Sequence, residues 1–486
     1  MFQNHHQAPL LETLARCART PDSPFYAPGH KRGRGIPQSL SNLLGTSVFL
    51  ADLPELPDLD NLFAPTGAIA AAQELAADAF GASQTWFLIN GSTAGIIAAI
   101  LATVRPGEKI ILPRTIHQSV ISGLILSGAL PVFIPPEFDP IWGLALSITP
   151  ASVAEALAAH PDAKAVMMVY PTYQGVCGDI QAIAQVTHQF GIPLLVDEAH
   201  GPHFAFHPDL PTPALVAGAD LSVQSIHKVL GAMTQASMLH IQGDCIDVHR
   251  LSQSLQLMQS TSPSYLLLAS LDAARQQMAL QGQELMTQTL ALSSRAREEI
   301  AQIPGLGVLT PPEPRIPGFV AGDRTRLTVG VWEWGVSGYE VDEILQERFG
   351  VTCELPSPDH LTFIISLGNT SADIDQLVQG FSTLAPDYGD NRRLGYRHPM
   401  PPSPALSCCP RDAFFAEVEA IPVTEAIGRV SAELVCPYPP GIPILMPSEA
   451  ITLEAVAYLQ QVLAQGGILT GCSDRTLTTL KVVRTR

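Results

Sequence analysis

The fold is decided by two short stretches of sequence, VDEAHG at residues 196–201 and QSIHKVLGA at residues 224–232. Asp197 follows an apolar segment at 193–196, which has the composition of a buried strand. Lys228 comes just after a second apolar segment, at 221–224. In open α/β sheets, ligands bind beyond the carboxyl ends of the strands. The two stretches therefore predict a carboxylate and an amine beside one ligand.

The chain around these stretches alternates helix-like and strand-like segments between about residues 65 and 245. Expected helices cover residues 68–80, 92–103, 151–159 and 180–190, and expected strands cover residues 85–89, 109–112, 131–134, 165–170, 193–196, 221–224 and 237–241. Apolar strands that alternate with helices are typical of a parallel sheet covered on both faces. The pattern predicts an α/β fold with a mainly parallel, seven-stranded type of sheet between helices.

Changes of composition divide the chain into further parts. A long helical stretch at 266–303 ends before the Gly- and Pro-rich segment 304–317, which indicates a domain boundary. Segments at 326–334, 339–349 and 361–366 suggest a smaller α+β domain. We expect an N-terminal segment at 1–50, a large ligand-binding domain at 51–305, a small α+β domain at 306–385, a Pro-rich linker at 386–410 and a C-terminal domain at 411–486.

Composition excludes several classes of protein. The 486 residues are 46% hydrophobic, which is too apolar for a disordered chain. A formal net charge of −18 disfavours nucleic-acid binding, which needs a basic surface. Apolar runs fall short of the ~20 residues that a membrane span needs. No signal peptide is recognised, and eight scattered cysteines without CxxC spacing predict reduced thiols, no metal site and a cytoplasmic location.

The pairing of Asp197 with Lys228 suits one cofactor, pyridoxal phosphate. This cofactor is an electron sink that needs a lysine Schiff base and a carboxylate partner for its pyridine nitrogen. Burial and a nearby cationic ring can lower the pKa of such a lysine. On these two residues alone, a helix-capping aspartate and a solvated surface lysine explain the pattern equally well.

A second element, LINGSTAGI at residues 88–96, has the pattern of an anion site. An apolar strand runs through Asn90 and Gly91 into Ser92 and Thr93, where a helix begins. Free backbone amides and small hydroxyl side chains at a helix start suit a phosphate. An ordinary helix cap explains the same residues. The absence of GxGxxG and GxxxxGK[ST] patterns at this element argues against a dinucleotide site or a P-loop.

Two histidines could belong to the same site. His117, in PRTIHQS, follows a strand, where its imidazole could stack on a pyridine ring. His200 follows Asp197 closely and could serve as an acid, a base or an orienting group. A polar loop histidine and a histidine at a helix start remain equally open interpretations.

Together these segments resemble the Orn/Lys/Arg decarboxylase family, and the resemblance covers most of the chain. The order and number of the motifs make the resemblance specific. The matching motifs are FYAPGHKRG (25–33), LPDLDNLFAPTGAIAAAQELAADAFGA (56–82), FLINGSTAGI (87–96), VYPTYQGVCGDI (169–180), DEAHG (197–201), QSIHKVLGAMTQASMLH (224–240), STSPSYLLLASLD (260–272) and EAIGRVSAELVCPYPPGIPILMPSE (425–449).

This resemblance implies the aspartate-aminotransferase type of fold (fold type I, the PLP-dependent transferase fold) with bound pyridoxal phosphate. It implies that Lys228 is the Schiff-base lysine, that Asp197 is the pyridinium partner, and that His117 stacks on the ring near His200. The remaining cofactor contacts it implies are Ser92, Thr93 and Ala94 at the phosphate, assisted by Ser225 and His227, with Ser260, Thr261 and Ser262 near the phosphate or at a dimer interface.

Some positions depart from the family pattern. Ile226 replaces a common threonine before the His-Lys pair, Gln118 replaces a basic residue, and Ser448 replaces a common glycine. These changes leave the lysine and the aspartate intact but could alter phosphate contacts or substrate choice. Few residues precede the first motif, so we expect the shorter, biosynthetic type of enzyme without the N-terminal wing domain.

The family resemblance implies decarboxylation of a basic amino acid for polyamine biosynthesis by a homodimer or larger homo-oligomer with shared active sites. Arginine is the first choice of substrate, followed by lysine and then ornithine. A cationic substrate end needs a carboxylate partner. Glu425 and Glu449 are the candidate partners, and Asp58 and Asp60 are weaker ones, although each could be a solvated or structural acid.

Three other functions stay open. An aminotransferase or aldolase with the same cofactor would differ in its products, and Arg429 could then bind the substrate carboxylate. A non-catalytic homologue is disfavoured by the intact Lys228 and Asp197. A DNA-binding regulator with a similar domain is disfavoured by the acidic charge.

Overall fold

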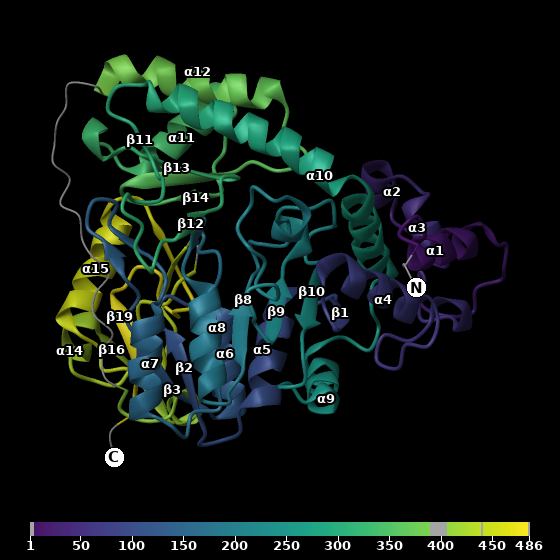
Figure 1. Cartoon of the computed structure of the whole chain (residues 1–486), viewed down its shortest axis with the longest axis horizontal. Coiled ribbons are helices and arrows are strands. Elements are labelled where there is room, and N and C mark those ends of the chain that lie inside the picture. Colours follow the sequence, from purple (N-terminus) through teal and green to yellow (C-terminus); the bar gives the residue numbers. More distant parts are fainter. Residues whose placement is uncertain (1–3, 389–405, 439–440, 485–486) are drawn as a thin grey trace. The chain divides into compact units, whose positions relative to one another are not determined.

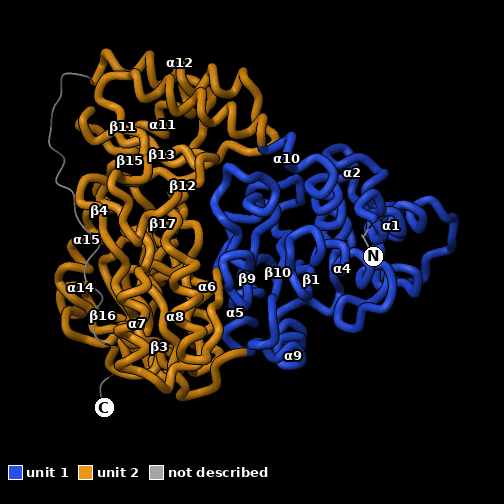
Figure 2. The backbone as a smooth tube through the Cα atoms, viewed as in Figure 1, with its two compact units in different colours: residues 1–102, 197–286 blue, residues 103–196, 287–486 orange. Residues whose placement is uncertain are grey.

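The structure is a computed structural model that describes residues 4–388, 406–438 and 441–484. The chain forms two compact units, which Figure 2 shows in blue and orange. Unit 1 comprises residues 1–102 and 197–286, and unit 2 comprises residues 103–196 and 287–486. Figure 1 labels the helices and strands that follow.

Unit 1 contains three antiparallel strands. β1 (Gln84–Leu88) pairs with β10 (Ser237–Ile241), and β10 pairs with β9 (Leu221–Gln224). Every residue of β9 and β10 is buried, including the polar residues Ser222, Gln224, Ser237 and His240. The short turns that follow β1 and β9 lead into α5 (Gly91–Thr103) and η3 (Ile226–Lys228).

The helices of unit 1 follow from their apolar spacing. In α4 (Ala68–Phe80), Ile69, Ala72, Ala76 and Phe80 recur at helical intervals and are buried. The helix ends at Gly81, whose φ of 69° is the left-handed conformation that glycine adopts most easily. The other helices are α1 (Pro9–Arg19), α2 (Gln38–Leu44), α3 (Val48–Ala51), η1 (Pro57–Leu59), α5 (Gly91–Thr103, whose last residue opens unit 2), η2 (Phe204–Phe206), η3 (Ile226–Lys228), α9 (Val248–Met258) and the first part of α10 (Tyr265–Ala301).

Unit 2 begins with four strands in the order β8-β6-β2-β3. β2 (Lys109–Pro113) is parallel to both β3 (Leu130–Ile134) and β6 (Ala165–Val169). Parallel neighbours need long crossovers, which here contain helices. These are α6 (Gln118–Ser127), α7 (Pro150–Ala159) and α8 (Ile180–Gln189), and β8 (Leu194–Asp197) completes the order. In Figure 1, α7 and α8 lie in front of the strands β2 and β3.

The rest of unit 2 contains two large hydrophobic clusters, besides a smaller one around Leu146 and Phe319. One lies among α10, α11, α12 and a four-stranded sheet in the order β11-β13-β15-β14, and the other is formed by residues 423–482. The elements are β4 (Phe138–Asp139), β5 (Leu144–Ala145), β7 (Val176–Cys177), β11 (Gly307–Val308), β12 (Ala321–Gly322), β13 (Arg326–Gly330), η4 (Trp332–Trp334), α11 (Gly338–Phe349), β14 (Leu355–Pro356), β15 (His360–Ile364), α12 (Ser371–Tyr388), α13 (Pro410–Phe415), β16 (Val418–Pro422), α14 (Val423–Ala426), β17 (Cys436–Tyr438), α15 (Leu453–Ala464), β18 (Ile468–Thr470) and β19 (Thr479–Val483).

The expected α/β architecture is confirmed. All seven expected strands are present, three in unit 1 and four in unit 2, although the three in unit 1 pair antiparallel. The expected domain boundaries stay predictions, and most of the Pro-rich linker, residues 389–405, lies outside the described residues. Within the described residues, every helix is too short or too polar to cross a membrane.

Candidate active site in unit 1

The candidate site begins at Asp197, the last residue of β8. Its side chain is 6% exposed, and its Oδ1 accepts a hydrogen bond from the Ala199 amide at 3.2 Å. Burial raises the pKa of Asp197, and the positive charge of Lys228 partly opposes that rise. A buried carboxylate of this kind gains most from a cationic partner that is equally shielded from water.

Lys228 ends the short helix η3, which follows β9. The helix is closed by a hydrogen bond from the Lys228 amide to the Ser225 carbonyl at 3.1 Å. The Lys228 Nζ lies 2.9 Å from Nε2 of His200. The structure therefore brings Lys228 and His200 into direct contact, in the same unit as Asp197.

The turn between β1 and α5 carries the expected phosphate residues. Gly91 has a φ of 73°, which allows the chain to reverse direction before the helix. Ser92 accepts a hydrogen bond from the Ser225 hydroxyl at 2.9 Å, so two of the expected phosphate residues are in contact. Thr93 is exposed and Ala94 is buried. A helix start of this kind offers amide donors to an anion.

His227 points its Nδ1 toward the Ala236 carbonyl at 2.9 Å. Burial lowers the pKa of His227, with the hydrogen bond to Ala236 opposing and Lys228 adding to that shift. The imidazole is therefore neutral at pH 7, with Nδ1 as donor. A phosphate contact by this residue stays a prediction.

Two glutamines that sequence motifs did not reveal hold the turn at the start of α5. Gln235 Nε2 donates to the Ile89 carbonyl at 2.7 Å, and Gln259 Oε1 accepts from the Ile89 amide at 2.8 Å. Gln235 has a φ of 85°, an uncommon conformation for a residue with a Cβ. Amide side chains follow no recognisable spacing, so only the fold could place them.

Glu198, next to Asp197, is the centre of a buried polar network. Its carboxylate accepts hydrogen bonds from the Ser222 hydroxyl at 2.6 Å, from Gln224 Nε2 at 2.9 Å and from the Ala214 amide at 2.8 Å. Burial raises the pKa of Glu198 to about 7 in spite of these three donors. The network anchors the segment that carries both Asp197 and His200.

The exposed residues Ser260, Thr261 and Ser262 form a turn in which the Ser262 amide donates to the Ser260 hydroxyl at 3.1 Å. Asp60 has a structural role, because it accepts the Gly67 amide at 2.8 Å and further amides at the start of α4. Burial alone would raise the pKa of Asp60, but the backbone donors lower it below its usual value. Asp58 is exposed.

The other expected site residues belong to unit 2. His117 is the N-cap of α6, which the sequence did not predict, and its Nδ1 accepts from the Ser119 amide at 3.2 Å. Glu449 is fully buried and binds Arg114 through both carboxylate oxygens, at 2.9 Å each. Glu425 is exposed on α14. The ring-stacking role of His117 and the substrate-binding roles of Glu425 and Glu449 stay predictions.

Arg429, the residue that an aminotransferase could use, is also in unit 2. Its guanidinium donates to Glu419 at 2.7 Å and to the Val483 carbonyl at 3.2 Å. In this conformation the Arg429 guanidinium already forms an ion pair with a carboxylate of the same chain.

Comparisons with known proteins match most of the chain to one family. Residues 8–318 match the Orn/Lys/Arg decarboxylase major domain, and residues 397–471 match the C-terminal domain of the same family. An arginine decarboxylase from Halalkalibacterium halodurans is 40% identical over 99% of both chains. An arginine decarboxylase from Bacillus subtilis is 38% identical, again over 99% of both chains.

The solved structure of lysine decarboxylase A from Pseudomonas aeruginosa has the same fold. The match covers 98% of this chain and 80% of the lysine decarboxylase chain, with a TM-score of 0.84 and 23% identity. The fold-type-I architecture expected from the sequence is thereby confirmed. By the extent of its matches, the chain belongs to the Orn/Lys/Arg decarboxylase family.

Proposed function

We propose that this chain is a pyridoxal-phosphate-dependent carboxy-lyase that acts on a basic amino acid, with arginine as the first candidate and lysine and ornithine next. The observation that carries the proposal is the contact between Lys228 and His200 in the unit that also contains the buried Asp197. The preference for arginine is supported by relatives at 40% and 38% identity that are arginine decarboxylases.

The residues present fit pyridoxal phosphate. Lys228 offers an amine for the covalent link, and Asp197 offers a buried carboxylate that needs a cationic partner. Ser92 and Ser225 place two hydroxyl groups 2.9 Å apart at the start of a 13-residue helix, where amide donors favour a phosphate. When bound, the cofactor would supply an electron sink for the electrons that remain when the carboxylate leaves.

The side chains around that cofactor have separable tasks. Asp197 would accept a hydrogen bond from a protonated ring nitrogen and so hold the ring's charge. The 2.9 Å contact lets His200 Nε2 exchange a proton with Lys228 Nζ, and either atom could return a proton to the substrate's α-carbon. Glu198 and its three donors keep this segment rigid, which orientation-controlled chemistry requires.

Incubation with arginine, lysine and ornithine separately tests the proposal. We expect carbon dioxide and one amine product, agmatine from arginine before the others, identified by mass. A protein that binds the cofactor but releases no carbon dioxide from any of the three would contradict the decarboxylase assignment. The Lys228→Ala protein must lose both turnover and the visible absorbance of a lysine-bound cofactor.

Two alternative functions are separated by the same assay. An aminotransferase would convert the amino acid to a keto acid without releasing carbon dioxide. The ion pair between Arg429 and Glu419 disfavours this alternative, because a carboxylate clamp needs an available arginine. A non-catalytic homologue would lack the lysine-bound absorbance altogether.

The proposal also covers the oligomeric state of the enzyme, its location and its pathway. We infer a homodimer or larger homo-oligomer, supported by exposed apolar side chains in unit 1, where Phe25 is 95% exposed and Leu43 on α2 is 78% exposed. All eight cysteines are free thiols, which supports a reducing, cytoplasmic location, and polyamine biosynthesis is the expected pathway. Light scattering after gel filtration would measure the oligomeric state.

A further inference from the structure

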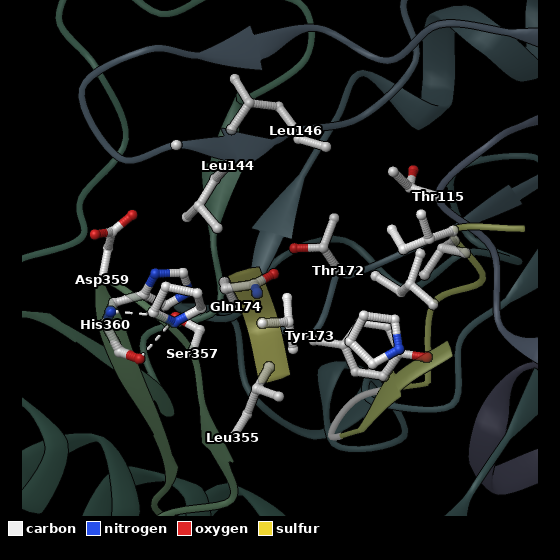
Figure 3. A pocket seen from close by; sticks show the side chains of 18 of the residues that line it. Thr115, Leu144, Leu146, Thr172, Tyr173, Gln174, Leu355, Ser357, Asp359 and His360 are labelled. Carbon is white, nitrogen blue, oxygen red and sulfur yellow. Dashed lines mark hydrogen bonds between the residues drawn. The ribbon is translucent and has the colours of Figure 1, made fainter. Parts of the chain in front are cut away.

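A cavity of about 150 Å³ lies within unit 2, and every residue that lines it belongs to that unit. Figure 3 shows Asp359 and His360 at one end and Thr115 at the other, with Leu144 and Leu146 on one side and Leu355 on the opposite side. A cavity of similar size with apolar walls holds a benzene molecule in another protein. The space therefore suits a ligand with a body of about six heavy atoms.

Several polar atoms around this cavity are buried without a hydrogen-bond partner among the described residues. They are Nδ1 and Nε2 of His360, the hydroxyl of Ser147 and Oε1 of Gln465. His360 is only 5% exposed and Ser147 is 4% exposed. A buried polar group that lacks a partner costs about 1–3 kcal/mol. The three residues that carry these atoms all line this one cavity, so a ligand with a polar group suits it better than a purely apolar one.

The charge of the cavity selects the kind of molecule. Among the described lining residues, Asp359 is the one carboxylate, and lysine and arginine are missing. Burial lowers the pKa of His360 to about 4, so its imidazole is neutral at pH 7. Burial, and after it the charge of Asp359, raises the pKa of the lining residue Tyr458. A carboxylate in the wall without a lysine or arginine among the described lining residues favours a cation over an anion.

We propose that this cavity binds a small organic amine, with its ammonium group at the end formed by Asp359 and His360 and its hydrocarbon body between Leu144, Leu146 and Leu355. The ammonium would donate to the Asp359 carboxylate and to one nitrogen of His360. The aliphatic carbons would replace contacts that an empty cavity lacks. The site does not depend on the decarboxylation proposed above, because all the residues that define it lie in unit 2.

The test measures binding to the complete holoenzyme by isothermal titration calorimetry at pH 7.5. The probe is N,N-dimethylbutylamine, a tertiary amine that cannot condense with an aldehyde and so cannot react with the cofactor. 1-Hexanol and pentanoate are the neutral and anionic probes. We expect the amine to bind at one site per chain, hexanol to bind more weakly, and pentanoate not to bind.

The variants locate the site. Asp359→Asn keeps the shape and removes the charge, so the affinity for the amine should fall about tenfold or more while that for hexanol stays the same. Leu144→Trp fills the cavity and should remove binding of both probes. Glu347→Gln removes an exposed acid of α11 outside the cavity and is the matched control, with unchanged binding expected.

Equal amine binding by Asp359→Asn and the unaltered protein would overturn the proposal, as would binding of pentanoate as tight as that of the amine. A complete lack of amine binding would show that water alone occupies the cavity, which also overturns it. Turnover is not used as a readout, so failure of the decarboxylation assay would leave this result unaffected. Circular dichroism of each variant confirms that it is folded.

Discussion

The candidate active site of unit 1 and the cavity of unit 2 both bury polar side chains, but they satisfy them differently. In unit 1, His240 is bonded on both ring nitrogens, to Thr85 at 2.8 Å and to Gln224 at 3.1 Å. In unit 2, neither ring nitrogen of His360 has a partner among the described residues. A satisfied network rigidifies a site, whereas unsatisfied groups mark a place that an external molecule completes. The hydrogen bonds of His240 are therefore supplied by the chain itself, whereas those of His360 would be supplied by the ligand that we propose for the cavity.

The largest expected effect separates the two regions by function. Lys228→Ala should lower kcat by at least about a thousandfold, because the covalent link and a proton-transfer group are lost together. Binding of N,N-dimethylbutylamine should be unchanged, since Lys228 is not among the described residues that line the cavity. Lys164→Ala, at an exposed lysine, is the control and should keep turnover. Retained turnover in Lys228→Ala would refute the site assignment. Loss of amine binding in the same variant would show that the cavity depends on the candidate active site.

The next prediction tests whether the network of unit 1 provides rigidity. Glu198→Ala leaves the Ser222 hydroxyl, the Gln224 amide and the Ala214 amide without their acceptor and should lower the free energy of unfolding by about 3 kcal/mol. Urea unfolding at pH 6 measures the change. A loss below about 1 kcal/mol would show that the network is dispensable.

Glu198 also predicts a pH dependence with a defined sign. Burial raises its pKa from 4.5 to about 7, so the folded chain binds a proton that the unfolded chain has released between these values. Stability from this group is therefore complete below about pH 4.5 and is lost as the pH rises to about 7 and beyond. Glu198→Gln should lack this loss. Parallel pH profiles for the two proteins would contradict the assignment.

The sequence predicted the fold, and it pointed to the core of the candidate site, because both depend on local patterns of residues. Alternating apolar strands and helices predicted the strand at 221–224 with the bounds that β9 has. The helix α6 was missed because its sequence, QSVISGLILS, contains serine and glycine where a helix pattern is usually clearest. Asp197, His200 and Lys228 were singled out because each lies at the carboxyl end of a strand or within four residues of it.

The cavity of unit 2 could not be predicted in the same way. Its lining residues are spread from Pro113 to Gln465, and neighbouring wall residues such as Leu144 and Leu355 are far apart in the chain. His360 begins an ordinary strand, β15, and its lack of a partner is a property of packing alone. The pairing of Glu449 with Arg114 could not be predicted from local patterns either, and the substrate-binding role of Glu449 stays a prediction.

A matched pair of substitutions sharpens the comparison at the two buried histidines. His240→Phe removes two hydrogen bonds and should lower the free energy of unfolding by about 2 kcal/mol, whereas His360→Phe should change it by less than about 0.5 kcal/mol. Burial lowers the pKa of His240 to about 3 and that of His360 to about 4. Each lowered pKa gives stability above pH 6.5 that is lost on acidification, so the comparison is made at pH 7.5. Equal losses would mean that His360 has partners as good as those of His240.

The smallest expected effect concerns two serine hydroxyls. Ser225→Ala removes the hydrogen bond to Ser92 and a phosphate donor, so the dissociation constant of pyridoxal phosphate should rise about fivefold, equivalent to about 1 kcal/mol. Ser147→Ala removes a hydroxyl that has no partner among the described residues, so stability should stay the same or increase slightly. Cofactor titration and urea unfolding of both variants measure the two effects. If Ser147→Ala destabilised the chain as much as Ser225→Ala, the hydroxyl would already be satisfied, and the case for a ligand in unit 2 would rest on His360 and Gln465 alone.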